Sequence, residues 1–103
     1  THDVWRSGDG GGTFELATET PGWCGRTHHE AVAHGARVVV LGGFGEFGYC
    51  NDCWASEDGA TWERLTASAA WSPRAMHAAA SFRGGLYVLG GYEGRGVCND
   101  VWA

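Results

Sequence analysis

The chain of 103 residues contains no lysine, isoleucine or glutamine, one methionine and two prolines. Its seven basic side chains are therefore all arginines, scattered along a chain whose formal net charge is −5. Contact with a phosphate backbone needs clustered cations, so we expect no nucleic-acid partner. No apolar run approaches the roughly 20 residues of a membrane-spanning helix, and we expect no membrane insertion.

Helical periodicity is also missing, because no window places apolar residues about 3.6 positions apart over several turns. Glycine, by contrast, is abundant, with 18 residues spread between short apolar segments. Glycine adopts the backbone angles that tight turns require. This composition predicts an all-β chain with many turns and essentially no helix.

An internal repeat organises the chain. Residues 51–54, Asn-Asp-Cys-Trp, return at 99–102 as Asn-Asp-Val-Trp, a shift of 48 positions, and residues 3–5 are a third copy of this signature. A fixed period near 50 marks a repeat architecture. The same shift relates further pairs, which are Trp23 and Trp71, Arg26 and Arg74, His29 and His77, Gly42-Gly43 and Gly90-Gly91, and Cys50 and Cys98.

Each repeat contains four short segments with strand character. An Asp-Gly turn at 58–59 joins the last two as a hairpin, and the second is a β-branched run that stops at Gly42-Gly43. Four short strands per period of about 50 residues predict a blade of a β-propeller. In the best-defined repeat the expected strands are 27–33, 37–41, 51–56 and 61–66.

One combination of motifs resembles the kelch repeat. It is an apolar strand ending in Gly-Gly, then an aromatic residue, then a tryptophan in the next strand, here Val40-Leu41-Gly42-Gly43, Trp54 and Trp62. Trp54 stands where the family often has tyrosine. The resemblance covers practically the whole chain. It implies kelch-type β-propeller blades, each of four antiparallel strands.

A second, shorter resemblance is to the Asp-box, Ser-x-Asp-x-Gly-x-Thr-aromatic. Residues 7–14 match it, and residues 56–62 match it with one residue deleted. Asp-boxes lie on hairpins of other propellers and are structural there. Asp and Ser side chains can bond the amides of their own turn. We therefore expect Asp9 and Asp58 to bond backbone amides within their own hairpins.

The order of strands predicts a partial propeller over residues 1–103. Residues 1–18 supply the last two strands of one blade, 26–66 a complete blade, and 74–103 the first three strands of the next. Blades bury their faces only against other blades, so we expect further blades to be needed, in cis or in trans. The signature at the end of the chain is redundant with the one at its start. That redundancy favours a fragment of a longer chain over assembly of several copies.

Histidines cluster around the start of the complete blade. On a continuous strand His28, Glu30 and His34 would share one face. His34 would then lie about 20 Å from His28, at about 3.3 Å per residue, which is too far to share a ligand. His29 has a counterpart at His77, which indicates a packing position of the repeat. We expect no metal and no cofactor.

The cysteines give no second signal for a metal. Cys50 and Cys53 lie three apart on a strand and point to opposite faces, and Cys50 and Cys98 are equivalents in adjacent blades. We expect Cys50, Cys53 and Cys98 to be small buried residues and Cys24 to be exposed. With no disulfide predicted, the compartment stays undetermined and leans to the cytoplasm.

Motifs of catalysis are missing. No nucleophile elbow, phosphate-binding loop or zinc-protease helix motif occurs. Tyr49, Tyr87 and Tyr92 do not form a copper-ligand set with histidines, so we assign no catalytic residue. The alternative is a fragment of a propeller enzyme that acts on carbohydrate, similar to galactose oxidase or a sialidase, whose decisive residues would come from other blades.

The remaining signal is a face of loops. The loops that enter the first strand of a blade and that join its second and third strands open on one side of a propeller. Here they carry aromatic and arginine side chains, which interfaces favour, and residues 44–49 differ from residues 92–97. We predict a non-catalytic scaffold that binds a protein partner, although for Arg26 and Arg74 hydrogen bonds between blades are the favoured role. The candidate binding residues are Trp23, Arg26, Phe44, Glu46, Phe47, Tyr49, Trp71, Arg74, Tyr92, Glu93 and Arg95.

Isolated blades expose strand edges and apolar faces, and such surfaces drive association. Expressed alone, the chain is expected to be oligomeric, poorly soluble or partly molten, and sedimentation of the purified chain distinguishes these states. A well-folded monomer with a cooperative melt would contradict the prediction. A discrete closed trimer or tetramer would favour assembly in trans.

Overall fold

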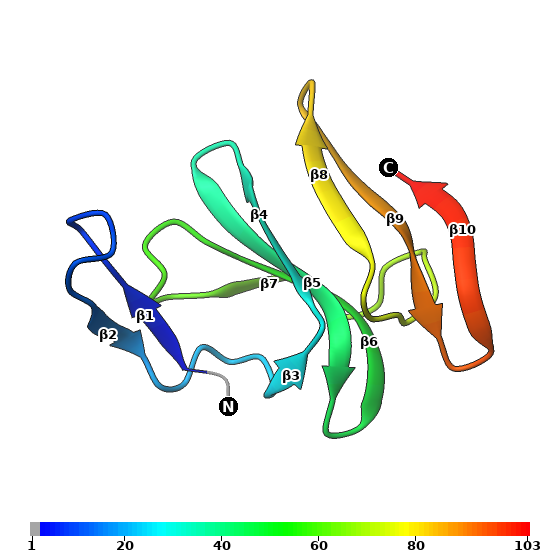
Figure 1. Ribbon diagram of the computed structural model, residues 1–103, viewed down its shortest axis with the longest axis horizontal. Coiled ribbons are helices and arrows are strands. Elements are labelled where there is room, and N and C mark those ends of the chain that lie inside the picture. The colour runs from blue at the N-terminus through cyan, green and yellow to red at the C-terminus, as the bar shows by residue number, and fades with distance from the viewer. Residues whose placement is uncertain (1–2) are drawn as a thin grey trace.

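The computed structural model describes residues 3–103, which form ten strands (Figure 1). No helix occurs in this range, and hence none long and apolar enough to cross a membrane. Every strand pairing is antiparallel, which confirms the all-β prediction. The strands are β1 (Val4–Arg6), β2 (Glu15–Thr18), β3 (Arg26–Thr27), β4 (Glu30–His34), β5 (Arg37–Gly45), β6 (Gly48–Ser56), β7 (Glu63–Thr66), β8 (Ala78–Phe82), β9 (Gly85–Glu93) and β10 (Gly96–Trp102).

These strands form three sheets that stand side by side in chain order (Figure 1). We call them the N-terminal hairpin (β1 and β2), the central sheet (β3 to β7) and the C-terminal sheet (β8 to β10). The β4–β5 and β8–β9 turns lie on one side of the row, and the β5–β6 and β9–β10 turns lie on the other (Figure 1). The second of these sides is the one on which the predicted binding loops lie.

The first strand of the central sheet is interrupted, which the sequence did not predict. His28 has a φ of 55°, so the chain bends between β3 and β4, and its counterpart Met76 has a φ of 56°. His28 therefore lies outside any strand, and the expected common face of His28, Glu30 and His34 is wrong. His34 instead bonds across to the next sheet, with its Nδ1 2.7 Å from Ser81 Oγ.

The two Gly-Gly motifs lie inside strands and not at their ends, which corrects a second expectation. Gly42 and Gly43 have φ values of 60° and 103°, and the pairing of β5 with β6 shifts between Leu41 and Gly43. Pairing then resumes, with Phe44 opposite Tyr49. The glycines make a bulge that re-aims the strand toward the loop face without ending it.

Close approach by neighbouring segments explains why these positions are glycine. A Cβ on Gly43 would lie 2.8 Å from His29 Cβ, and one on Gly91 would lie 2.8 Å from His77 Cβ. A Cβ on Gly42 would lie 2.7 Å from His77 Cε1 of the next sheet. Gly42 and Gly43 thus admit a histidine from their own sheet and another from the neighbouring one.

A small core joins the central and C-terminal sheets. Its apolar residues are Val39, Leu41, Cys53, Ala55, Trp71 and Val88. Backbone hydrogen bonds fasten the same two sheets, from Gly43 N to Arg74 O at 2.8 Å and from Arg74 N to Cys50 O at 3.0 Å. The segment before β8 is therefore fixed against β5 and β6.

The hairpin prediction for the two aspartates is confirmed. Asp9 Oδ1 accepts the amide of Thr13 at 3.0 Å, and Asp58 Oδ1 accepts the amides of Ala60 and Thr61, each at 2.9 Å. These backbone hydrogen bonds lower the pKa of both carboxyl groups. Each carboxylate thus holds its own turn together.

The tight approach at Gly42 predicts that Gly42→Ala destabilises the fold strongly. Left-handed backbone strain and displacement of His77 should together cost about 3 kcal/mol or more in the free energy of unfolding, measured in urea. Gly35→Ala is the matched control, because Gly35 has a φ of 62° but no atom near its Cβ position. It should cost only about 1 kcal/mol. Equal losses for the two variants would contradict the role given to His77.

Candidate functional site

The candidate site is the loop face formed by the β5–β6 and β9–β10 turns and the segments that lead into β3 and β8. Pairing of Arg26 with Gly45 places the first of these segments beside the end of β5. A bridge between Ala75 and Tyr92 places the second beside the end of β9. The two sheets thus build the face in the same way.

A row of aromatic rings crosses from one sheet to the next on this face. Phe44 and Tyr49 are opposite each other on β5 and β6, with ring centroids 5.0 Å apart and planes at 74°. Tyr49 in turn lies 6.0 Å from the ring of Tyr92, which belongs to β9. Phe44 and Tyr92 are exposed, and Phe47 at the nearby turn is 91% exposed. Exposed aromatic rings in a continuous row are suited to protein contact.

A hollow of about 410 Å³ lies beside Tyr49 and between the two sheets. Its wall includes Glu93 and Arg95 from the C-terminal sheet, so it presents both signs of charge next to the aromatic row. Ser72 Oγ donates a hydrogen bond to Glu93 Oε2, which holds that carboxylate in place. The sequence prediction missed Ser72 and Pro73, which also line the hollow.

The eleven predicted binding residues divide by exposure. The structure places Phe44, Glu46, Phe47, Tyr92 and Arg95 on the surface and Tyr49 and Glu93 half-buried. It places four others in the interior, with no more than 7% of any of them exposed. These are Trp23, Arg26, Trp71 and Arg74.

Arg26 is buried as the centre of a hydrogen-bonded unit under the loop face. Its Nη1 and Nη2 donate to the two carboxylate oxygens of Asp52 at 2.7 and 3.0 Å. Nη1 also donates to Gly42 O at 3.0 Å, and Nε donates to Cys24 O at 3.3 Å. The guanidinium therefore ties the segment before β3 to the Gly-Gly bulge and to β6. These partners belong to its own repeat, and those of Arg74 belong to the next one, so the expectation that the two arginines form hydrogen bonds between blades is wrong for their guanidinium groups.

Trp54 completes this unit, because its Nε1 donates to Asp52 Oδ2 at 2.9 Å. Burial raises the pKa of the Asp52 carboxyl, but the hydrogen bonds from Arg26 and Trp54 outweigh burial and leave the pKa below its usual range. The carboxylate thus stays charged at neutral pH, as a bidentate partner of a buried guanidinium must.

The C-terminal sheet repeats the unit. Arg74 donates to Asp100 at 2.7 and 3.0 Å, to Gly90 O at 2.9 Å and to Ser72 O at 3.2 Å, and Trp102 Nε1 donates to Asp100 at 2.8 Å. At the N-terminal hairpin the same bond runs from Trp5 Nε1 to Asp3 Oδ2 at 3.0 Å. The three Asp-x-Trp signatures are therefore structural.

The recurring histidines belong to the scaffold too. The rings of His29 and His77 lie 6.3 and 6.0 Å from the tryptophans of their own repeats, Trp23 and Trp71. Burial, and then the nearby arginine, lower the pKa of each histidine, so both are neutral at neutral pH. Among residues 3–103 no group of three or more His, Cys, Asp or Glu side chains is placed to hold a metal ion.

The cysteines differ in part from expectation. Cys53 is buried, and burial raises its pKa to about 11. Cys50 and Cys98 are half-buried and not enclosed in the core, and Cys24 is likewise half-buried. The prediction of burial is thus confirmed for Cys53 and wrong for Cys50 and Cys98.

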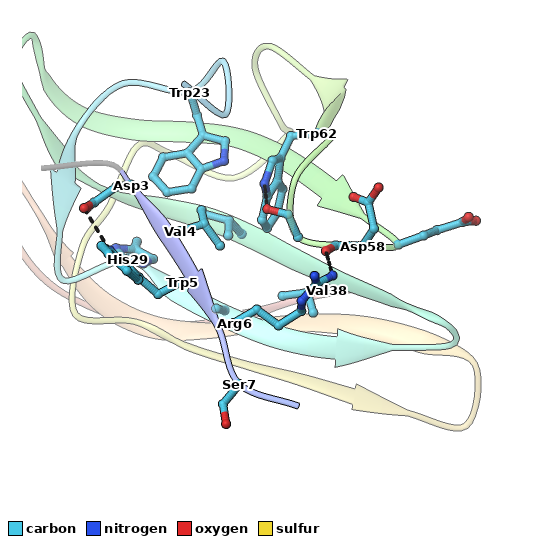
Figure 2. A pocket seen from close by; sticks show the side chains of 14 residues that line it. Asp3, Val4, Trp5, Arg6, Ser7, Trp23, His29, Val38, Asp58 and Trp62 are labelled. Carbon is cyan, nitrogen blue, oxygen red and sulfur yellow. Dashed lines mark hydrogen bonds between the residues drawn. The ribbon is translucent and has the colours of Figure 1, made fainter. Parts of the chain in front are cut away.

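A larger hollow, of about 680 Å³, lies between the N-terminal hairpin and the central sheet. Figure 2 shows Trp23 and Trp62 grouped with Val4 of β1, and the two indole rings meet edge to face at 5.7 Å. Ala31 and Val40 form part of its wall. Their counterparts under the repeat, Ala79 and Val88, belong to the filled core between the other two sheets.

Comparison with known families supports the repeat interpretation. Residues 73–103 match the family model of the kelch motif. This chain contains a kelch repeat. The matched span runs from Pro73 through β10, and the kelch Gly-Gly at 90–91 recurs at 42–43 in the central sheet. No curated protein matched the chain. Kelch repeats are in general scaffolds for protein interaction.

The buried bidentate pair of Arg26 and Asp52 predicts that Asp52→Ala lowers the free energy of unfolding by about 3 kcal/mol, because it leaves the Arg26 charge buried without a partner. Glu63→Ala is the control. The Arg37–Glu63 pair is 3.9 Å long and exposed, so its loss should cost under about 1 kcal/mol. Urea unfolding measures both.

The same variant has a pH signature. The folded-state pKa of Asp52 lies below its ordinary value of 3.8. Its contribution is therefore complete above that pH and disappears as the pH falls through the lowered value. The difference between wild type and Asp52→Ala should shrink in acid, and a difference that grows below that pH would contradict the assignment.

Proposed function

We propose that the chain is part of a non-catalytic recognition scaffold whose loop face binds a protein partner. The observation that carries the proposal is the aromatic row of Phe44, Tyr49 and Tyr92, which spans two sheets and has the exposed Phe47 at its side. Rings in such a row offer large contact area at little cost in side-chain entropy.

Charged residues beside the aromatic row form a polar rim around this apolar centre. Glu93 and Arg95 line the hollow next to Tyr49, and Glu46 lies exposed at the β5–β6 turn. A central apolar contact surrounded by charged groups of both signs is the usual anatomy of a protein interface. Binding of a polyanion such as a nucleic acid would instead need a surface on which positive charges are clustered.

The four buried residues of the original prediction act in this proposal as positioning residues. Arg26 and Arg74 hold the loops from beneath, through bonds to Cys24 O and Ser72 O. Trp23 and Trp71 lie in the segments that lead into β3 and β8 and are buried there. The exposed residues therefore make the contact, and the buried ones set its shape.

Further blades complete the scaffold in this proposal, whether in cis or in trans. The hollow beside the N-terminal hairpin is the counterpart of the space that Val39 and Leu41 fill in the other interface. A strand equivalent to β5, from another blade, would occupy it. This argument rests on the correspondence of Ala31 and Val40 with Ala79 and Val88 under the repeat.

The binding proposal is tested by loop variants. Proteins retained on the immobilised chain are identified by mass spectrometry, and the affinity of the most enriched one is measured for each variant. Phe47→Ser and Tyr92→Ala should each weaken binding at least about tenfold, because Tyr92 belongs to the aromatic row and Phe47 is a 91% exposed ring beside it.

Phe82→Ser is the matched control. Phe82 is 57% exposed but ends β8, at the turn on the opposite side of the row (Figure 1). It should leave the affinity unchanged. Circular dichroism confirms that all three variants keep their strands. A partner whose affinity falls with Phe82→Ser and not with the loop variants would place the interface on the other side and refute the proposal.

A further inference from the structure

Two thiols meet at the edge of the loop face, on either side of one glycine. Gly45 belongs to β5, which pairs with β3 on one side and with β6 on the other. A Cβ on Gly45 would lie 3.1 Å from Cys24 Sγ and 3.6 Å from Cys50 Sγ. Both sulfurs thus border the same small space, which a side chain on any other residue would occupy.

The surroundings of the two sulfurs differ. Arg26 Nη2 donates to Cys24 Sγ at 3.5 Å, while Cys50 Sγ donates to Gly48 O at 3.6 Å. Cys24 lies in the irregular segment between β2 and β3, whereas Cys50 is held within β6. The segment that carries Cys24 can therefore make the backbone movement that a bond between them requires.

Both cysteines are half-buried, so neither residue is enclosed in the core. Burial raises the pKa of Cys50, and the neighbouring Cys24 thiol is a smaller cause in the same direction. A raised pKa makes Cys50 the poorer first nucleophile. Cys24, which lies in the irregular segment between β2 and β3, is the sulfur to which we assign the first attack.

We propose that Cys24 and Cys50 form a reversible disulfide in exchange with a small-molecule disulfide of the oxidised-glutathione class. The Cys24 thiolate attacks one sulfur of the reagent, which forms a mixed disulfide and releases one thiolate. The Cys50 thiolate then attacks the Cys24 sulfur and expels the second. Two electrons pass to the reagent, which leaves as two thiols, and the two cysteine protons are transferred to it through solvent.

The C-terminal sheet contains a natural control for this pair. Cys98 corresponds to Cys50 and is also half-buried, but the counterpart of Cys24 is Ser72. Arg74 Nη2 donates to Ser72 Oγ at 3.0 Å, as Arg26 does to the Cys24 sulfur. The second site therefore repeats the geometry without the second sulfur, and Cys98 has no partner there for a disulfide.

The new bond would join the segment before β3 directly to β6, beside Tyr49. In the reduced chain Arg26 links that segment to β6 without a covalent bond, by way of Cys24 O and Asp52. Oxidation would add a covalent link in parallel with this noncovalent one. The proposal concerns bond formation alone and is independent of what the loop face binds.

The test titrates the full chain with glutathione buffers of rising oxidised fraction. Free thiols are then blocked with N-ethylmaleimide, the chain is digested with trypsin, and the peptides are identified by mass spectrometry. Peptide 7–26 should appear joined to peptide 38–64 and should separate again with dithiothreitol. Cys98 should be blocked as a free thiol in the same samples. The Cys24–Cys50 bond should reach half completion at an oxidised-glutathione level at least about tenfold below that at which Cys98 forms its mixed disulfide.

Two variants sharpen the outcome. Cys53→Ala should keep the link, which assigns it to Cys50 within peptide 38–64. Ser72→Cys should add a second link, between peptides 65–74 and 96–103. The proposal is overturned if Cys24 stays free through the titration, if Cys53→Ala abolishes the link, or if Cys98 joins Cys24 as often as Cys50 does. The last pattern is what random collision in an unfolded chain would produce.

Discussion

The fold depends on a buried guanidinium that bonds a carboxylate at both oxygens. Each such arginine also reaches a carbonyl of the Gly-Gly bulge and a carbonyl of the loop before its sheet, so one side chain fixes three segments that are far apart in sequence. A buried charge of this kind is costly unless every donor is used. The unit therefore tolerates little change at Arg26 or Asp52. It also explains why loops rich in glycine hold a defined shape.

The Gly-Gly bulge is the second constraint, and it is linked to the first. Its carbonyl accepts from the arginine, and its missing side chains admit histidines from two sheets. The ring of His77 packs on Gly42, and its backbone lies against Gly91. One histidine therefore fixes the position of two neighbouring sheets relative to each other. Interaction between repeats thus comes from a few exact fits and a small apolar core, as in other chains that stack similar units.

Much of this was accessible from the sequence, because the repeat gives spacing and strand order. The all-β fold follows from composition, the hairpin bonds of Asp9 and Asp58 follow from a local motif, and the packing role of His29 follows from its recurrence at His77. The bend at His28 could not be predicted, since it depends on a left-handed residue that has no glycine to mark it. The continuation of β5 past Gly42-Gly43 could not be predicted either, because a glycine pair is compatible both with a turn that ends a strand and with a bulge inside it.

The division of the loop face into buried and exposed residues has a signal in the sequence. The predicted binding residues that are identical in the two repeats, Trp23 with Trp71 and Arg26 with Arg74, are buried. Positions that differ, such as Phe47 with Arg95, lie on the surface of the same loops. Recurrence within one chain marks what every blade needs in order to fold, and variation marks what a single blade presents to its surroundings. The pair of Cys24 with Ser72 follows the same logic. This half-buried position under the loop face differs between the two repeats. The central sheet therefore has a pair of thiols, Cys24 and Cys50, where the C-terminal sheet has Ser72 and Cys98.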